Sequence, residues 1–218
     1  MAFMLLSQKK AGEAVSLLER EYNEARYYLD FSTPIDLAVA AILSAQTHDY
    51  TVNAITPGLF KKYRTAKDYA NADPERLAAE ARGVAFAGSK ARNIVAACKI
   101  INEKFGGRVP DKMADLVELP GIGRKTANTI LINAYGIVEG IPVDTWVIKL
   151  SGRIGLSGSG DPDGIERDLM KKVSRRYWKN FAYVLKEHGH RICHSQVPLC
   201  SKCLLNRICP RNGVVKSA

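Results

Sequence analysis

Apolar residues recur every three or four positions along most of the chain. Three such sets are Val15, Leu18 and Tyr22; Leu37, Ala40 and Ala41; and Ile94, Ala97, Cys98 and Ile101. This spacing lines one face of an α-helix, whereas the strict alternation typical of strands is missing. Glycine and proline interrupt the pattern at short intervals, and these residues end helices or open turns. The pattern therefore predicts an all-α protein of about ten short helices.

The clearest loop between predicted helices is SGSGDPDG, residues 157–164. Asp161 and Pro162 suit the N-cap and the first position of the next helix. A chain of 218 residues with 46% hydrophobic residues can form one or two compact domains. No apolar run approaches the roughly 20 residues that span a bilayer, and the first residues lack the pattern of a secretion signal. We therefore predict a cytoplasmic protein.

The net charge of +10 is concentrated in the C-terminal third. Residues 145–218 hold 14 Lys and Arg against 5 Asp and Glu, a net charge of +9, and residues 1–144 hold 18 against 17. A local basic surface attracts polyanions, of which nucleic acid is the commonest. A solvated basic face without a partner is the alternative.

The segment LPGIGRKTAN, residues 119–128, places Gly121 and Gly123 directly before Arg124 and Lys125. A helical pattern precedes it, and a second one follows over residues 124–136 and ends near Gly136. We therefore expect the glycines in a tight hairpin between two helices. Glycine permits a positive φ, and its missing side chain lets a ligand approach the backbone. Backbone amides in such a hairpin suit a phosphate, although a plain helix end before a new helix would explain the same residues.

Lys125 is expected in the first turn of the second helix of this hairpin. There the positive end of the helix dipole and the adjacent Arg124 both disfavour a charged ammonium, and an uncharged amine is a nucleophile. Most lysines, however, are surface residues without such a role. Asp144, in PVDTWV, is a second candidate for the chemistry, or the N-cap of a helix that begins at Thr145.

Four of the five cysteines lie within seventeen residues, spaced C-x6-C-x2-C-x5-C: Cys193, Cys200, Cys203 and Cys209. In a chain without a secretion signal, this density indicates a metal centre more than disulfides. Zinc satisfies four thiolates, but the usual zinc pattern has two C-x-x-C pairs and this chain has one. Cys98 lies alone on an apolar helical face and is expected in the core.

These segments resemble the helix-hairpin-helix, Gly/Pro…Asp superfamily of DNA glycosylases, most closely its endonuclease III branch. Five segments follow the family's order: ILSAQTHD at 42–49, GSKARNI at 88–94, LPGIGRKTAN, VDTWV and the C-terminal cysteines. The resemblance implies two helical domains flanking a DNA-binding groove. One is a six-helix barrel with the hairpin, residues 27–137, and the other is an iron–sulfur-cluster domain, residues 1–26 with 138–218. The implied partner of the monomer is double-stranded DNA with damaged bases or abasic sites, which would place it at the nucleoid.

The resemblance also implies a reaction. Lys125 attacks C1′ of a damaged nucleotide, and Asp144 stabilises the charge that develops on the sugar. A lysine Schiff base then permits β-elimination, which cleaves the strand 3′ to the abasic site. The implied enzyme is a bifunctional DNA glycosylase/AP lyase of base excision repair that removes oxidised pyrimidines. The four clustered cysteines are implied to hold a [4Fe–4S] cluster, with zinc as the alternative.

The implied DNA contacts come from several segments: Gly121, Gly123 and Arg124 of the hairpin, Gln46, Phe86, Arg175 and Arg176. Gln46 matches the family's intercalating glutamine, and Phe86 a second wedge that fills the space left by a flipped base. Their alternatives are an exposed glutamine at a helix end and a core aromatic. Arg175 and Arg176 lie in KKVSRRYWK, whose alternative reading is a solvated helix face.

Two features depart from the family. Trp146 stands where most close relatives have histidine, and the loop HSQVPL lacks the basic residues that relatives often carry. Two rival functions are a monofunctional mismatch glycosylase, which usually lacks a lysine at position 125, and a non-catalytic DNA-binding iron–sulfur redox protein. The presence of Lys125 argues against the first rival, and the coincidence of Lys125 with Asp144 argues against the second.

Overall fold

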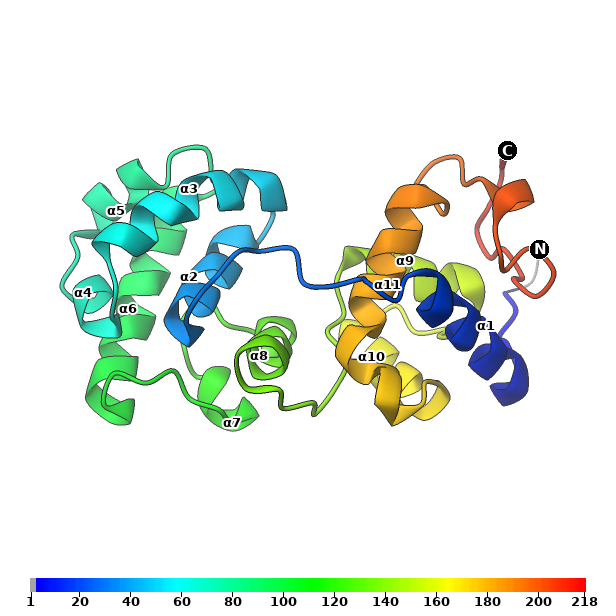
Figure 1. Ribbon diagram of the computed structural model, residues 1–218, viewed down its shortest axis with the longest axis horizontal. Coiled ribbons are helices and arrows are strands. Elements are labelled where there is room, and N and C mark those ends of the chain that lie inside the picture. Colours follow the sequence, from blue (N-terminus) through cyan, green and yellow to red (C-terminus); the bar gives the residue numbers. More distant parts are fainter. Residues whose placement is uncertain (1–2) are drawn as a thin grey trace. The chain divides into compact units, whose positions relative to one another are not determined.

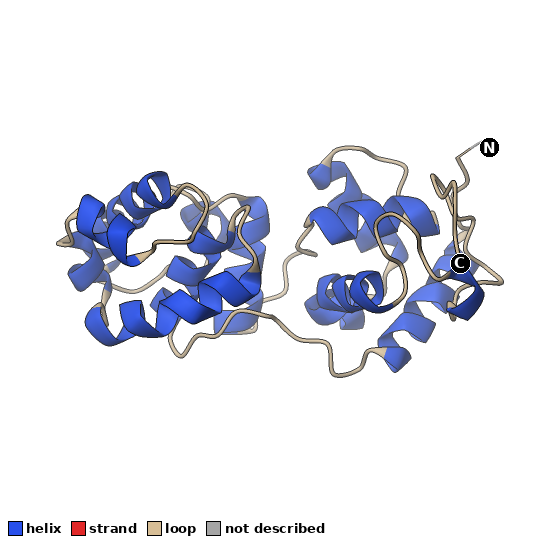
Figure 2. Ribbon diagram, turned by 90° about the horizontal axis from the view of Figure 1, so that it is seen from above, coloured by secondary structure: helices blue, strands red, loops and turns tan. Residues whose placement is uncertain are grey.

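The computed structural model describes residues 3–218, and every regular element in that part of the chain is a helix (Figures 1 and 2). The predicted all-α class is confirmed, and the ten apolar residues of the three helical sets are all buried. None of the described helices is long and apolar enough to cross a bilayer. The elements are α1 Gln8–Glu21, α2 Pro34–Ser44, α3 Asp49–Lys62, α4 Ala66–Ala70, α5 Pro74–Glu80, α6 Ala87–Phe105, α7 Met113–Leu116, α8 Arg124–Ile130, the π-helix η1 Leu131–Tyr135, α9 Thr145–Ile154, α10 Pro162–Lys172, the 3-10 helix η2 Arg175–Tyr177, α11 Trp178–Arg191 and the 3-10 helix η3 Cys200–Lys202.

The chain divides into two compact units. One unit is Tyr28–Ile137, and the other combines Met1–Tyr27 with Val138–Ala218. The first contains α2 to α8 and the π-helix η1, and the second contains α1 and all elements from α9 onward. The assignment of these segments as a barrel domain and an iron–sulfur domain stays a prediction.

The unit of residues 28–137 is organised around α2. Every residue of this helix from position 35 to position 43 is buried, as expected for a helix that is apolar on all sides. Its one buried carboxylate, Asp36, closes a capping box with Thr33 and so satisfies amides at the start of the helix. The helix contacts α3, α6 and α8. Consequently the loop that follows α2 and the loops that precede α6 and α8 are all attached to the same core.

The second unit has a separate apolar core. It is formed by α1, α9, α10 and α11, and Leu18, Leu150, Leu169 and Phe181 are fully buried in it. α10 begins as predicted, with Asp161 as the N-cap and Pro162 as the first residue. The helix therefore takes up the last three residues of the loop predicted over 157–164, because the Asp-Pro pair begins the helix inside that stretch.

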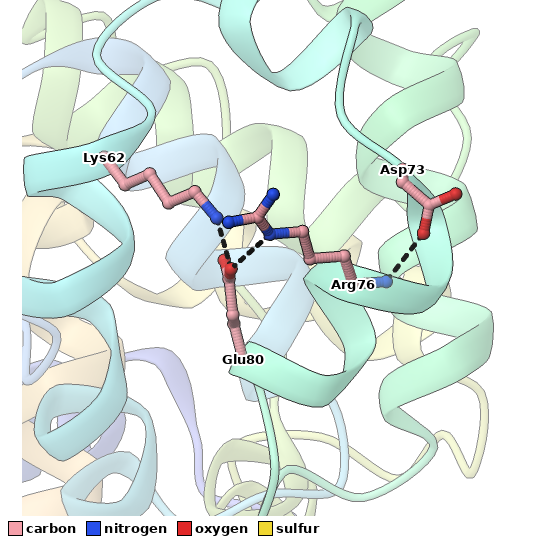
Figure 3. A network of polar contacts seen from close by, with 4 residues as sticks. All are labelled: Lys62, Asp73, Arg76 and Glu80. Carbon is pink, nitrogen blue, oxygen red and sulfur yellow. Dashed lines mark hydrogen bonds and ion pairs between the residues drawn. The ribbon is translucent and has the colours of Figure 1, made fainter.

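A small ion network joins the C-terminal end of α3 to α5 on the surface of the first unit (Figure 3). Lys62 and Arg76 both contact Oε1 of Glu80, the Arg76 Nε at 3.3 Å. Asp73 caps α5, since its Oδ1 accepts a hydrogen bond from the Arg76 amide at 2.8 Å. Exposed ion pairs contribute about 0–1 kcal/mol each, so the network fixes the relation of two helix ends more than it stabilises the core.

Candidate functional site

The predicted hairpin lies between α7 and α8. Gly121 has φ +83°, and a Cβ on it would lie 3.1 Å from Asn93 Cβ and 3.3 Å from Ile42 Cγ2. Glycine is therefore required there both by conformation and by the close packing against α2 and α6. Gly123 differs: its φ is −91°, and a Cβ would meet no atom of residues 3–218 within 4 Å. The backbone at Gly123 is exposed, with space in front of it for another molecule.

Arg124 and Lys125 occupy the first turn of α8, and both side chains are exposed. The predicted helix over residues 124–136 is present, but its last turn widens into the π-helix η1. The positive-φ Gly136 ends it, as predicted. Among residues 3–218, no side chain caps the start of α8, so the hairpin offers backbone and cationic side chains at one point of the surface.

Asp144 is the N-cap of α9, in the other unit. Its Oδ1 accepts hydrogen bonds from the amides of Trp146 and Val147, both at 2.9 Å. The capping alternative is therefore correct for one carboxylate oxygen. Within residues 3–218, Oδ2 makes no hydrogen bond, and the residue is half-buried. One oxygen thus holds the carboxylate in place, and the other is available for chemistry.

Trp146 packs against α11. Its indole meets the His190 ring edge to face, with centroids 4.9 Å apart, and the Lys149 ammonium lies 5.4 Å from its centroid. Through these contacts the first turn of α9, which Asp144 caps, packs against α11. Tryptophan at this position has a packing role that the sequence alone did not reveal.

Gln46 and Phe86 share an unusual backbone conformation. Among residues 3–218, the non-glycine residues with positive φ are Gln46 at 53°, Phe86 at 58° and Arg211 at 58°. Phe86 is 68% exposed, so its reading as a core aromatic is wrong. Gln46 is exposed in the turn that follows α2. Strained residues cluster at functional sites, and two of these three are the residues expected to enter DNA.

All four clustered cysteines line one pocket in the second unit. Cys193 follows the end of α11, Cys200 begins η3, and Cys203 and Cys209 lie in the turns beyond it. Within residues 3–218, no three Cys, His, Asp or Glu side chains converge closely enough to hold a single metal ion. The pocket thus gathers four sulfur donors.

Two further residues contact the cysteines, and the sequence did not single them out. The Arg153 guanidinium of α9 lies 3.3 Å from Cys193 Sγ and donates to the carbonyl of His194 at 2.9 Å. His188 Nε2 lies 3.6 Å from Cys203 Sγ, and its Nδ1 is 3.0 Å from the Tyr22 hydroxyl. Arg153 is forty positions from Cys193 in the chain, so spacing gave no signal for it.

The cysteine pocket favours uncharged groups. Burial raises the pKa of the Cys209 thiol to about 11 and lowers the pKa of His188 to about 4. Burial also raises the pKa of Cys193, an effect that the Arg153 guanidinium opposes. A bound cation would therefore favour the thiolate forms of Cys193 and Cys209. Cys98 lies apart from them and is 2% exposed, which confirms its place in the core.

The basic run KKVSRRYWK does not lie on a single helix. It covers the end of α10, the 3-10 helix η2 and the start of α11. Arg175 and Arg176 are exposed, and their guanidinium carbons lie 5.4 Å from the Trp178 centroid and 4.6 Å from the Tyr177 centroid. The break in helical structure arranges two arginines on aromatic rings at one corner of the second unit.

The sequence matches the HhH-GPD superfamily of base excision DNA repair proteins over residues 39–175. The all-helical fold with a glycine hairpin is thus that of a DNA repair superfamily. The endonuclease III of Synechocystis sp. is 42% identical over 207 residues, which cover 95% of this chain and 94% of that protein. The structure of a trapped endonuclease III–DNA covalent intermediate is 33% identical, with a TM-score of 0.90 over 95% of this chain and 97% of that one. The chain belongs to the endonuclease III family.

The fold by itself is shared more widely. A thermostable thymine-DNA glycosylase that is 20% identical has a TM-score of 0.82, covering 93% of this chain and 96% of that one. Its identity is low enough that this match describes architecture alone. The choice between activities therefore depends on the residues of the site.

Proposed function

We propose that this protein is a bifunctional DNA glycosylase and DNA-(apurinic or apyrimidinic site) lyase of base excision repair that acts on oxidised pyrimidines. Membership of the endonuclease III family supports the enzyme class. The single observation that carries the bifunctional reaction is Lys125, exposed in the first turn of α8 directly beyond the hairpin. Its partner is double-stranded DNA with damaged bases or abasic sites, bound by the monomer in the cytoplasm at the nucleoid.

Lys125 is the proposed nucleophile. Its uncharged amine attacks C1′ of the damaged nucleotide, so that an N–C1′ bond forms while the bond to the base breaks and the base leaves with a proton. Opening of the sugar gives a Schiff base, which acidifies the C2′ proton. Loss of this proton expels the 3′ phosphate by β-elimination, and hydrolysis releases the lysine. One amine thereby serves both glycosylase and lyase steps.

Asp144 is the proposed electrostatic partner. The carboxylate oxygen that does not cap α9 stabilises the positive charge that develops on the sugar as the base leaves, and it accepts protons. The two hydrogen bonds from backbone amides to Oδ1 hold the carboxylate in place and leave the second oxygen, Oδ2, for this role. Asp144 therefore acts mainly in the steps before and during base loss.

The damaged base must leave the duplex before C1′ can be attacked. The exposed backbone at Gly121 and Gly123, with Arg124 beside it, is proposed to hold a phosphate without reading sequence. Gln46 and Phe86 fill the space left in the stack. The exposure of Phe86 and the positive φ of both wedge residues support this role. Arg175 and Arg176 add phosphate contacts from the basic C-terminal third.

Cys193, Cys200, Cys203 and Cys209 are proposed to hold a [4Fe–4S] cluster. The donor set fits, since four sulfurs line one pocket and four cysteine thiolates are the usual ligands of such a cluster; zinc is the alternative. When bound, the cluster would supply a structural cross-link for the C-terminal segment, and no step of the base-excision reaction is assigned to it.

Borohydride trapping tests the proposal. Borohydride reduces a Schiff base, so an intermediate formed by lysine attack becomes a stable covalent protein–DNA adduct. A glycosylase that uses water as the nucleophile forms no such adduct. The wild-type protein should trap on a duplex with thymine glycol and on one with a preformed abasic site. Lys125→Ala should trap on neither while still binding abasic DNA, because the hairpin backbone is unchanged. Absence of any wild-type adduct would favour the monofunctional rival, and trapping by Lys125→Ala would place the nucleophile elsewhere.

A further inference from the structure

Thr47 connects the two loops that carry Gln46 and Phe86. Its Oγ1 accepts a hydrogen bond from the Ala85 amide at 3.1 Å and another from the Lys90 ammonium at 3.0 Å. The same hydroxyl donates to the Ala45 carbonyl at 3.4 Å. A hydroxyl can donate one hydrogen bond and accept two. Thr47 therefore uses its full capacity between residue 45 on one loop and residue 85 on the other.

Lys90 completes the same network. It lies in the first turns of α6, is only 6% exposed, and donates to the Leu43 carbonyl at 2.7 Å, to the Ala45 carbonyl and to Thr47. An ammonium has three N–H donors, so each one has an acceptor. Two of these acceptors are carbonyls at the C-terminal end of α2, where the helix dipole favours a cation. A part-buried network in which every member is satisfied favours a rigid arrangement.

The network stands directly beside both strained residues. The Thr47 amide bonds the Ser44 carbonyl at 3.0 Å, and Ala45 has φ −57° and ψ 120°, which is the geometry of a type II turn. Gln46 therefore occupies the turn position that glycine prefers. Phe86 is the left-handed N-cap of α6, with its carbonyl bonded by the Lys90 amide at 3.1 Å. Left-handed backbone costs a non-glycine residue about 1–2 kcal/mol, so something must hold each residue there.

We propose that Thr47 and Lys90 are positioning residues that lock the Gln46 and Phe86 loops together, so that the two side chains enter the DNA stack as one unit. The inference rests on the proposed function for the identity of the ligand, the duplex around an extruded base. Thr47 and Lys90 touch no substrate; they act through Gln46 and Phe86. Loss of the shared hydroxyl releases both loops, because the Ala85 amide and one Lys90 hydrogen then have no acceptor.

The test uses Thr47→Val, which keeps the shape of the side chain and removes only the hydroxyl. The duplex carries 2-aminopurine opposite a tetrahydrofuran abasic analogue, which cannot form a Schiff base. Insertion of a wedge unstacks 2-aminopurine and raises its fluorescence. Wild-type protein should raise it, and Thr47→Val should raise it far less at equal saturation of binding. Thr47→Ser, which retains the hydroxyl, should restore the signal. Lys99 is an exposed lysine of the same helix. Lys99→Met is therefore the matched control for Lys90→Met and should leave the 2-aminopurine fluorescence rise unchanged.

Activity provides the second readout. Thymine glycol excision by Thr47→Val should fall about tenfold, as expected when a buried donor loses its acceptor. Lyase activity on a preformed abasic site should fall much less. In the background of Gln46→Ala with Phe86→Ala, Thr47→Val should add no further loss, because it acts through those side chains. A full additional loss in that background, or a full fluorescence rise with Thr47→Val, would overturn the proposal. A wild-type protein that unstacks 2-aminopurine but excises nothing would contradict the proposed function and leave the positioning role intact.

Discussion

Gly189 and Trp146 fit together so closely that no side chain can separate them. A Cβ at Gly189 would lie 2.2 Å from Cε3 and 2.5 Å from Cζ3 of the indole. The φ of Gly189 is not in the left-handed region, so space, and not backbone conformation, requires glycine there. The contact ties α11 to the first turn of α9, two residues from Asp144.

Gly189→Ala should therefore destabilise the protein by about 1–3 kcal/mol, the usual cost of overpacking. Urea denaturation measures this change. Gly12→Ala is the matched control: Gly12 is also inside a helix, but a Cβ there meets no described atom within 4 Å. That variant should be more stable by about 0.5–1 kcal/mol. The same substitution should thus change the free energy of unfolding in opposite directions at the two positions.

The indole itself can be tested in the same background. Trp146→His replaces it by a smaller ring and should reduce the cost of Gly189→Ala, giving a coupling free energy of about 0.5–3 kcal/mol in a double-mutant cycle. Additive effects of the two substitutions would show that the contact does not carry the destabilisation. The cycle separates packing of α9 on α11 from any effect of Trp146 on substrate.

Asp144→Asn separates the two roles of that residue. Asparagine caps helices about as well as aspartate, so the free energy of unfolding should change little. Excision of thymine glycol should be lost, because the amide cannot stabilise positive charge on the sugar, while some borohydride adduct should survive on a preformed abasic site. Asp161→Asn, at the cap of α10, should alter neither. Equal losses on both substrates would assign Asp144 to the lyase step as well.

Gln46→Gly should make the protein more stable and less active. Glycine adopts the left-handed conformation without the strain of about 1–2 kcal/mol, but it has no side chain to fill the vacated stack. Gln46→Ala removes the same side chain and keeps the strain, so it should lose excision activity without the gain in stability. Paired measurements of urea midpoint and thymine glycol excision check both effects. A Gln46→Gly protein with unchanged stability would mean that the turn is not strained.

The helices and the hairpin were predictable because their causes are local. The apolar period near 3.6 predicted that Leu18, Leu37 and Ile94 face the core, and all three are buried. The Asp-Pro pair predicted the start of α10. The positive φ of Gln46 and Phe86 was not predictable, since nothing in a glutamine or phenylalanine indicates a conformation that such residues rarely adopt.

The surroundings of the site were harder to predict because they depend on contacts between distant segments. Arg153 reaches Cys193 from another helix, and Lys90 reaches Thr47 across forty-three positions. Both side chains look like ordinary surface cations in the sequence. The family resemblance supplied the expected ligands of the cluster and the two residues expected to react, but not the residues that support them.

The cluster assignment predicts about four iron and four sulfide atoms per chain in anaerobically prepared protein, with a yellow-brown colour. Cys203→Ala should lose this content and destabilise the C-terminal segment. Cys98→Ala removes a cysteine of the separate core and should keep the full complement. Elemental analysis and the visible spectrum measure both variants. Stoichiometric zinc without sulfide would contradict the iron–sulfur assignment.

Arg175 and Arg176 are expected to contact DNA phosphates, and the salt dependence of binding tests this. Each phosphate contact contributes a slope of about −0.9 to the plot of log binding constant against log salt concentration, because counterions are released. The double substitution Arg175→Gln with Arg176→Gln should therefore reduce the slope for undamaged duplex by up to about two units. Lys9→Gln with Lys10→Gln removes the same charge from exposed positions of α1 in the same unit. If net charge alone governed binding, both double variants would change the slope equally. A loss of slope confined to the arginine pair would place the phosphate contacts at η2. An unchanged slope for the arginine pair would mean that both arginines are only solvated side chains.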